Sequence, residues 1–207
     1  MRLGLFGGTF DPVHLAHLAI AETARERLGL DRVVFIPAGA PPHKAGQAVS
    51  PAADRLEMVR AAVADNPSFA CSDVELLRPG PSYAADTLGA FAQAHPGAEL
   101  FWLLGSDSVT ELHTWRAPDR LFRLATFVGL ARPGWPEAQV RAWLAAQPPG
   151  MRPRLEFVDV PLLEISASEV RRRAAAGESV RYLVPDPVRA YLLAHGLYRP
   201  EGSGGHA

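Results

Sequence analysis

The sequence has little of what marks secreted, membrane-spanning or nucleic-acid-coating proteins. It contains one cysteine, Cys71, in 207 residues, which excludes an internal disulfide and a cysteine-rich metal site and fits a reducing cytoplasm. No apolar run approaches the length of a transmembrane helix, and the N-terminus lacks the pattern of a signal peptide. The formal net charge of −1 gives no support for wholesale binding of nucleic acid or of a membrane surface. We therefore expect a cytoplasmic protein that binds neither.

Two familiar phosphate-binding loops are also absent. The chain contains neither the dinucleotide pattern G-x-G-x-x-G nor the Walker A pattern. No segment repeats with a period of about 20 to 50 residues, which excludes a solenoid. With 48% apolar and 21% charged residues, the composition is that of an ordinary globular protein, and the length suits one domain. We assign residues 1–200 to that domain and residues 201–207 to a flexible tail.

Short apolar segments alternate with helical patterns along the chain. The sequence predicts strands near residues 3–6, 33–37, 69–72, 100–104, 126–130 and 155–160. It predicts helices near residues 15–28, from 51 onward, 82–94, 136–147, 168–176 and 187–195, with a broken helical region around Trp115. Three of these helices have expected N-caps, namely Ser50, Ser82 and Asp186. The alternation predicts an α/β fold with a Rossmann-like, doubly wound, mainly parallel sheet and a small C-terminal helical portion.

The stretch from Gly7 to His17 leads from the first predicted strand into the first helix. Glycines here can adopt positive φ and let a ligand approach the backbone, and the helix start offers free N–H groups to a phosphate. His14 and His17 are three residues apart, so both lie on one face of the first turn and can donate to phosphate oxygens. An ordinary turn with two surface histidines, or half a metal site, is the alternative. The combination of features favours a phosphate site.

A second candidate phosphate site opens the predicted helix at residues 168–176. Ser166 and Glu169 have the spacing of a capping box, and the local pattern alone favours that structural role. The same geometry exposes N–H groups and hydroxyls beside Arg171, which can hold a phosphate. Ser166 can cap the helix while Ser168 and Arg171 face a ligand, so the two roles are compatible.

Further candidates follow other strands or lie in nearby loops. Each has a plain structural alternative: a solvated lysine, a helix cap, helix packing or a core indole. In a parallel sheet, ligands gather at the carboxyl ends of the strands, which is the reason to place several of these segments in one site. These candidates are Lys44, Tyr83, Thr87, Gly105, Asp107, Trp115 and Arg132.

Together these stretches resemble a known family. G-G-T-F-D-P-V-H-x-x-H is similar to the first signature of the nucleotidylyltransferase superfamily with the H-x-G-H motif, with Ala16 at the usual glycine. Ile165 to Arg171 is similar to its second signature, I-S-x-[ST]-x-x-R, with Ser168 in place of the more usual threonine. The Ser82–Leu88 block, with Ala84 at a common threonine, and the Trp115 block narrow the resemblance to bacterial nicotinate-mononucleotide adenylyltransferases. The resemblance covers nearly the whole chain.

The resemblance implies a reaction and a set of site residues. AMP would pass from ATP to nicotinate mononucleotide by direct attack of the acceptor phosphate, with Mg²⁺ held mainly by the ATP phosphates. A homo-oligomer is left open. The implied catalytic residues are His14, His17, Lys44 and Arg171. The implied ATP-binding residues are Gly7, Gly8, Thr9, Phe10, His14, His17, Gly105, Asp107, Ile165, Ser166, Ser168 and Arg171. The implied acceptor-binding residues are Lys44, Tyr83, Thr87, Trp115 and Arg132.

Three other functions compete with this one. Pantetheine-phosphate adenylyltransferases and cytidylyltransferases share both phosphate signatures but are not expected to carry the Ser82–Leu88 and Trp115 blocks. A nucleotide-binding sensor without turnover is disfavoured by the intact histidines and basic residues. A tRNA synthetase fragment would rest on H-x-x-H alone, and the chain is too short for an added tRNA-binding domain.

Overall fold

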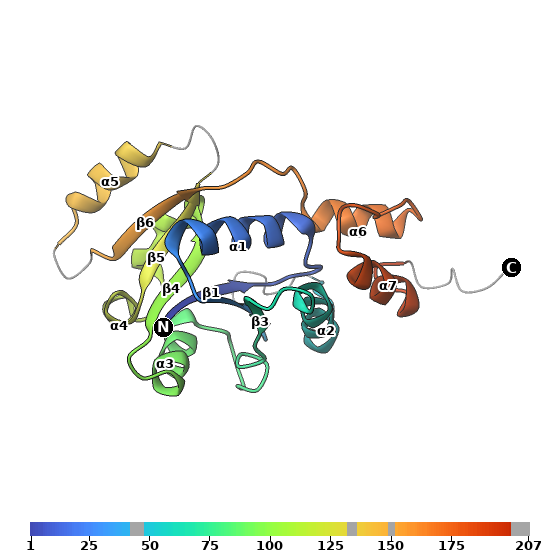
Figure 1. The fold of residues 1–207 in the computed structure, drawn as a ribbon, viewed down its shortest axis with the longest axis horizontal. Helices are drawn as coiled ribbons and strands as arrows, with labels where there is room; N and C mark the ends of the chain where they lie inside the picture. The colour runs from blue at the N-terminus through green and yellow to red at the C-terminus, as the bar shows by residue number, and fades with distance from the viewer. Residues whose placement is uncertain (42–47, 132–135, 149–151, 200–207) are drawn as a thin grey trace, which may run out of the picture.

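In a computed structural model, which describes residues 1–41, 48–131, 136–148 and 152–199, six strands form one sheet (Figure 1). They are β1 (Arg2–Gly8), β2 (Arg32–Pro37), β3 (Phe69–Cys71), β4 (Glu99–Gly105), β5 (Thr126–Ala131) and β6 (Arg154–Asp159). Every pairing is parallel, and the strand order is β3-β2-β1-β4-β5-β6. This is the doubly wound Rossmann-like order that the sequence predicts.

Helices cover both faces of this sheet. One face carries α1 (Leu15–Leu28) and α2 (Ala52–Val63), and the other carries α3 (Ala84–Ala94), the 3₁₀ helix η2 (Ser106–Thr114), α4 (Pro118–Leu124) and α5 (Glu137–Ala145). The short helices α6 (Ala167–Ala175) and α7 (Asp186–Ala194) lie together at one end of the molecule, beyond the sheet (Figure 1). They form the small C-terminal helical portion that the sequence predicts.

The alternation of side chains along the strands builds two cores. In β1, Leu3 and Leu5 point to the face covered by α3 and α4, whereas Phe6 points to the face covered by α1 and α2. All three side chains are buried. The central strands are therefore apolar on both faces, which explains their continuous apolar runs.

The strand order reverses between β1 and β4, and this reversal positions the site. The chain leaves β1 toward β2 on one side and enters β4 on the other side, which opens a crevice at their carboxyl ends. Gly7 and Gly8 end β1 and Gly105 ends β4. The first sequence motif and the Gly105–Asp107 segment are thus brought together by the topology.

Three predicted N-caps are wrong. Pro51 occupies the N-cap of α2, and the Ser50 N–H instead donates to Asp11 Oδ2 at 3.2 Å. Tyr83 occupies the N-cap of α3, since the Ser82 hydroxyl accepts from the N–H groups of Gly39 and Ala40. Asp186 is the first residue of α7, after Pro185 at the N-cap. The Ser82 hydroxyl and the Ser50 backbone N–H both bond to residues of other loops, and local sequence patterns do not reveal such bonds.

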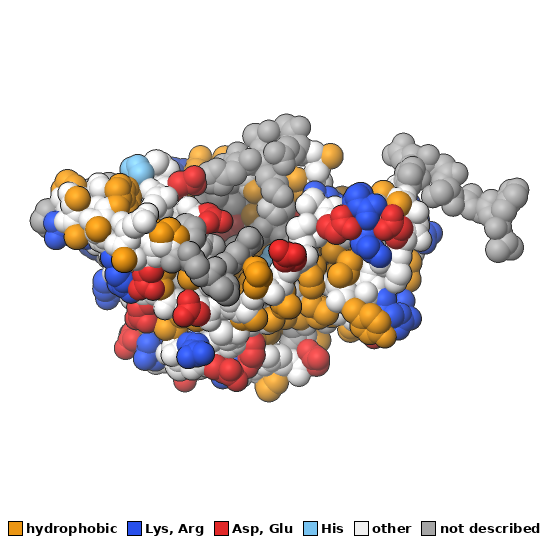
Figure 2. Space-filling model, turned by 90° about the horizontal axis from the view of Figure 1, so that it is seen from above, with side chains coloured by type: hydrophobic (Ala, Val, Ile, Leu, Met, Phe, Trp, Pro, Cys, Tyr) orange, Lys and Arg blue, Asp and Glu red, His pale blue; other side chains and the backbone are white. Residues whose placement is uncertain are grey.

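Charged side chains of both signs occur on the face of the molecule shown in Figure 2. On the face shown in Figure 2, acidic and basic side chains are interspersed, in keeping with the net charge of −1. Among the helices that the structure describes, none combines the length and apolar character needed to cross a bilayer. The predicted tail at residues 201–207 lies outside the described residues, as do Lys44 and Arg132.

Candidate active site

His14 and His17 stack on one another at the start of α1. His14 is the N-cap residue of the helix and His17 lies three positions later, so their ring centroids are only 3.6 Å apart with planes 22° apart. The His14 backbone N–H donates to Nδ1 of His17 at 3.2 Å. Because Nδ1 accepts this bond, the proton of a neutral His17 ring sits on Nε2, which makes Nε2 a hydrogen-bond donor.

Both imidazoles are uncharged near neutral pH. Burial lowers the pKa of His14 to about 4. Burial, with a smaller contribution from the neighbouring His14, lowers the pKa of His17 to about 3. Nδ1 of His14 is buried and has no hydrogen-bond partner within the described parts of the chain. The pair therefore offers neutral hydrogen-bonding groups, supported by the positive end of the α1 dipole.

The two glycines before this helix do not adopt the positive φ that the sequence analysis allowed them. Neither Gly7 nor Gly8 has a positive φ, because both continue the extended backbone of β1. A Cβ on Gly7 would lie 2.9 Å from the Trp102 indole, and one on Gly8 would lie 2.9 Å from the Phe10 ring. The glycines are needed for space beneath aromatic rings. Within the stretch from Gly7 to His17, the residue with a positive φ is Phe10, at 47°.

A first pocket, which we call the imidazole pocket, lies between α1 and the segment before α6. It brings together nine of the twelve residues predicted to bind ATP, drawn from both sequence signatures and from the end of β4. Asp107 is exposed at its edge, in the first turn of η2. The nine residues are Gly7, Gly8, Phe10, His14, His17, Gly105, Asp107, Ile165 and Ser166.

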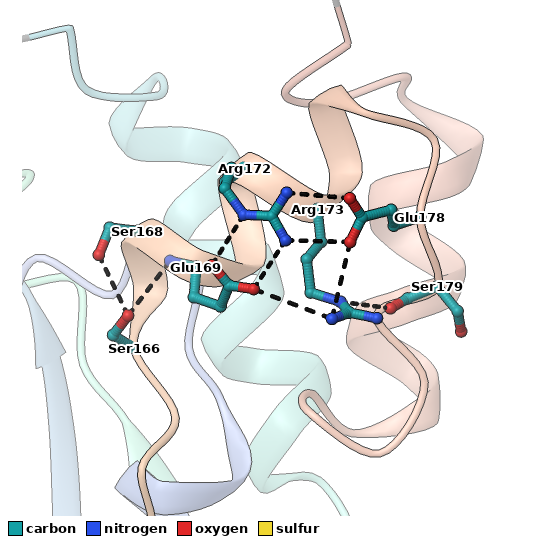
Figure 3. A network of polar contacts seen from close by, with 7 residues as sticks. All are labelled: Ser166, Ser168, Glu169, Arg172, Arg173, Glu178 and Ser179. Carbon is teal, nitrogen blue, oxygen red and sulfur yellow. Dashed lines mark hydrogen bonds and ion pairs between the residues drawn. The ribbon is translucent and has the colours of Figure 1, made fainter.

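The helix α6 presents its N-terminus to this pocket. Ser166 is the N-cap, as predicted, and its hydroxyl accepts from the Glu169 N–H at 3.2 Å (Figure 3). The second half of the expected capping box is not formed, since the Glu169 carboxylate binds Arg172 instead. Arg172 also binds Glu178, which ties α6 to the turn after it (Figure 3).

Arg171, the basic residue of the second signature, lies next to the imidazole pocket and does not line it. Ser168 and Arg171 line an adjoining groove together with Asp11 and Tyr198. Arg171 donates to the Asp11 carbonyl at 2.7 Å, and the Ser168 hydroxyl lies 3.1 Å from that of Ser166. The two sequence signatures, 160 positions apart, are therefore in direct contact.

A second pocket, the indole pocket, lies on the other side of the β1 end. Gly7 and Gly8 line both pockets, whereas the predicted ATP residue Thr9 lines only this one. Trp115 and Tyr83 line it, as predicted for acceptor binding. Apart from the glycines, its wall is made mostly of aromatic and small side chains, which suits a flat ring.

Thr87 does not reach the indole pocket. Its side chain is fully buried, and its hydroxyl donates to Oε1 of Glu75 at 2.7 Å. Direct contact between Thr87 and an acceptor is therefore not supported, because the hydroxyl is engaged behind the pocket wall. Glu75 itself is buried and lines the pocket. The predicted acceptor residues Lys44 and Arg132 lie outside the described residues.

Sequence reasoning missed two residues that line or support the site. Arg116 lines the indole pocket with its guanidinium 4.5 Å above the Tyr83 ring, and its place after Trp115 was a usable signal. Arg55 is 1% exposed and donates to three carbonyls in two loops, those of Thr9, Gly39 and Ser50. Its position inside the amphipathic pattern of α2 gave no signal.

Comparison with known proteins places this geometry in a class. A family model described as "Cytidylyltransferase-like" matches residues 5–173, and the chain belongs to that family. Within it, the chain belongs with the bacterial nicotinate-nucleotide adenylyltransferases. It is 47% identical to the probable nicotinate-nucleotide adenylyltransferase of Thermomicrobium roseum, over 96% of this chain and 92% of that protein. Identity is also 47% to that of Thermus thermophilus, over 96% of this chain and all of that protein.

The fold is also shared with solved structures. The nicotinic acid mononucleotide adenylyltransferase of Plasmodium falciparum, solved in complex with NaAD, has a TM-score of 0.76 to this structure. The alignment covers 95% of this chain and 97% of that chain at 16% identity. At that identity the likeness concerns the fold alone.

Proposed function

We propose that this protein transfers AMP from ATP to nicotinate mononucleotide, giving deamido-NAD and pyrophosphate. The observation that carries the proposal is the pair of pockets that share Gly7 and Gly8. A nucleotide in the imidazole pocket and a pyridine nucleotide in the indole pocket would meet over these glycines. Membership of the bacterial nicotinate-nucleotide adenylyltransferases supports the choice of substrates.

The chemistry needs positioning and charge stabilisation more than a protein nucleophile. An oxygen of the acceptor phosphate attacks the α-phosphorus of ATP, the bond to the β-phosphate breaks, and pyrophosphate leaves with that bridging oxygen. Because the acceptor is already an anion, no general base is required. His14 and His17 would donate to the triphosphate, and Ser168 with Arg171 would hold the leaving pyrophosphate. Lys44 would offset charge near the acceptor, and Trp115 would stack on the pyridine ring.

Magnesium fits this site as a companion of the triphosphate. Within the described residues, no group of three or more His, Cys, Asp or Glu side chains is placed to hold a metal ion. In the proposed reaction, phosphate oxygens and water would hold Mg²⁺, and the ion would screen negative charge there. The location in the cytoplasm, which rests on the low cysteine content, stays a prediction, and the oligomeric state stays open.

Pyrophosphate release from ATP and Mg²⁺ tests the proposal. Nicotinate mononucleotide, its amide and phosphopantetheine are compared as acceptors, and CTP is compared with ATP as donor. Fast release with ATP and the acid mononucleotide is expected. Release with phosphopantetheine alone, or with CTP alone, would point to another member of the superfamily. ATP binding without release with any acceptor would indicate a sensor.

A variant pair connects the activity to the imidazole pocket. His17→Ala should lower turnover about 100-fold, the scale for loss of one transition-state donor. His195→Ala, at the exposed end of α7, is the matched control and should leave turnover unchanged. Equal turnover in the two variants would show that His17 takes no part in the reaction.

A further inference from the structure

The turn between β1 and α1 contains a strained residue. Phe10 has φ of 47°, in the left-handed region that bulky side chains rarely occupy. Its ring is buried and packs edge-on against the His17 ring, with centroids 5.1 Å apart. A displacement of Phe10 would therefore move the His17 imidazole. Such a conformation persists only where its surroundings hold it in place.

Both neighbours of Phe10 are held by partly buried hydrogen bonds. On one side, the Thr9 carbonyl accepts from Arg55 at 2.8 Å. On the other side, the Asp11 side chain is 3% exposed, and its Oδ1 accepts from the Tyr198 hydroxyl at 2.7 Å. Tyr198 lies 187 positions away in the sequence and itself has a positive φ of 67°. One short hydrogen bond thus joins Tyr198, which has a positive φ, to the residue that follows Phe10.

We propose that Tyr198 is a positioning residue, whose hydroxyl holds Asp11 and thereby keeps Phe10 and the His17 ring in place for the reaction. The proposal rests on the proposed function, because it assigns His17 a role in the transfer. Burial, together with the bond to Asp11, raises the pKa of Tyr198 well above its usual value, so the hydroxyl stays a donor. The Tyr198 hydroxyl and the Ser50 N–H each donate to one oxygen of the Asp11 carboxylate, which would be costly to bury without donors.

The chain offers a matched control for removal of this hydroxyl. Tyr191, in α7, donates its hydroxyl to Asp54 in α2 at 2.9 Å. This bond also joins the C-terminal portion to the main body through a tyrosine and an aspartate, but it does not touch the turn. Tyr198→Phe and Tyr191→Phe each remove one such bond and no ring.

The test measures kcat and both KM values for the wild type and the two variants, using whichever acceptor the wild type accepts best. Assays are run well below the unfolding midpoint of each variant. Tyr198→Phe should lower kcat about 10-fold with KM values little changed, as small displacements of a catalytic group do. Tyr191→Phe should keep wild-type kcat. Equal kcat values for the two variants would overturn the proposal.

A double variant asks whether the effect passes through His17. In a His17→Ala background, Tyr198→Phe should lower kcat no further, because the ring that it positions is gone. An independent 10-fold loss in that background would refute the route through His17. Failure of the proposed function is distinguishable, since it would appear in the acceptor preference of the wild type and not in the comparison of variants.

Discussion

Acid should destabilise this protein through its two buried imidazoles. The pKa values of His14 and His17 in the folded chain, about 4 and about 3, lie below the unfolded value near 6.5. Between those values the unfolded chain binds more protons than the folded chain, so the free energy of unfolding falls as the pH falls. The stability that the neutral imidazoles allow is fully present above the pKa of the unfolded chain. It is lost as the pH falls toward the pKa values of the folded chain.

The size of the effect follows from the same pKa values. Between pH 7 and pH 5, each imidazole should lower the free energy of unfolding by about 2 kcal/mol. Through the two imidazoles together, acidification from pH 7 to pH 5 should therefore lower the free energy of unfolding by about 4 kcal/mol. This is a large share of the roughly 5–15 kcal/mol that stabilises a typical domain. Titrating carboxylates add to the acid sensitivity, so the histidine share is measured as a difference between variants.

Urea unfolding followed by tryptophan fluorescence at pH 7 and pH 5 gives that difference. In His17→Gln, the loss of stability on acidification should be smaller than in the wild type by about 2 kcal/mol. His195→Gln, which alters an exposed ring at the end of α7, should show the wild-type loss. If His17→Gln lost as much stability on acidification as the wild type, the reasoning would be refuted. The His17 ring would then be no harder to protonate in the folded chain than in the unfolded chain.

Three further predictions concern the pockets, the buried arginine and the metal. Trp115→Ala should raise the KM of the acceptor about 10-fold with little change in kcat, since it removes binding shared by ground and transition states. An unchanged KM in steady-state kinetics would indicate that Trp115 packs in the protein and does not bind the acceptor. Arg55→Met should lower the free energy of unfolding in urea by about 3 kcal/mol, because three loop carbonyls lose their donor; a loss below about 1 kcal/mol would contradict this. EDTA should abolish pyrophosphate release and added Mg²⁺ restore it, whereas dialysis without ATP should find no tightly bound Mg²⁺; persistent release in EDTA would contradict the proposed role of the metal.

The fold was largely predictable because its signals are local. Apolar runs that lack alternation marked the buried strands, and their alternation with helices indicated a parallel sheet. The placement of His14 and His17 on one face of the first turn followed from their spacing, whereas the stacking of their rings was seen only in the structure. The predicted cap at Ser82 was wrong because its hydroxyl accepts from the distant loop at Gly39 and Ala40, and α2 begins one residue later than Ser50 predicts, with Pro51 at the N-cap.

The parts of the site that escaped prediction depend on contacts over long sequence separations. Nothing near Thr87 indicates that Glu75 engages its hydroxyl, and so its burial behind the indole pocket was not foreseen. Gly7 and Gly8 lack the positive φ considered for them, and the requirement for glycine at Gly7 also has a long-range cause. Gly7 is required by the indole of Trp102, which reaches it from the neighbouring strand β4.

The neutrality of the imidazoles constrains how the site can handle a triphosphate. Two uncharged rings can donate hydrogen bonds but cannot balance several negative charges, so the charge has to be offset by other groups. The structure brings two helix N-termini to the imidazole pocket, that of α1 at His14 and that of α6 at Ser166. Their dipoles and free N–H groups favour anions without adding a mobile charge. We infer that fixed dipoles and neutral donors orient the phosphates, while Arg171 and a Mg²⁺ ion bound with the triphosphate would supply the positive charge that offsets the leaving pyrophosphate.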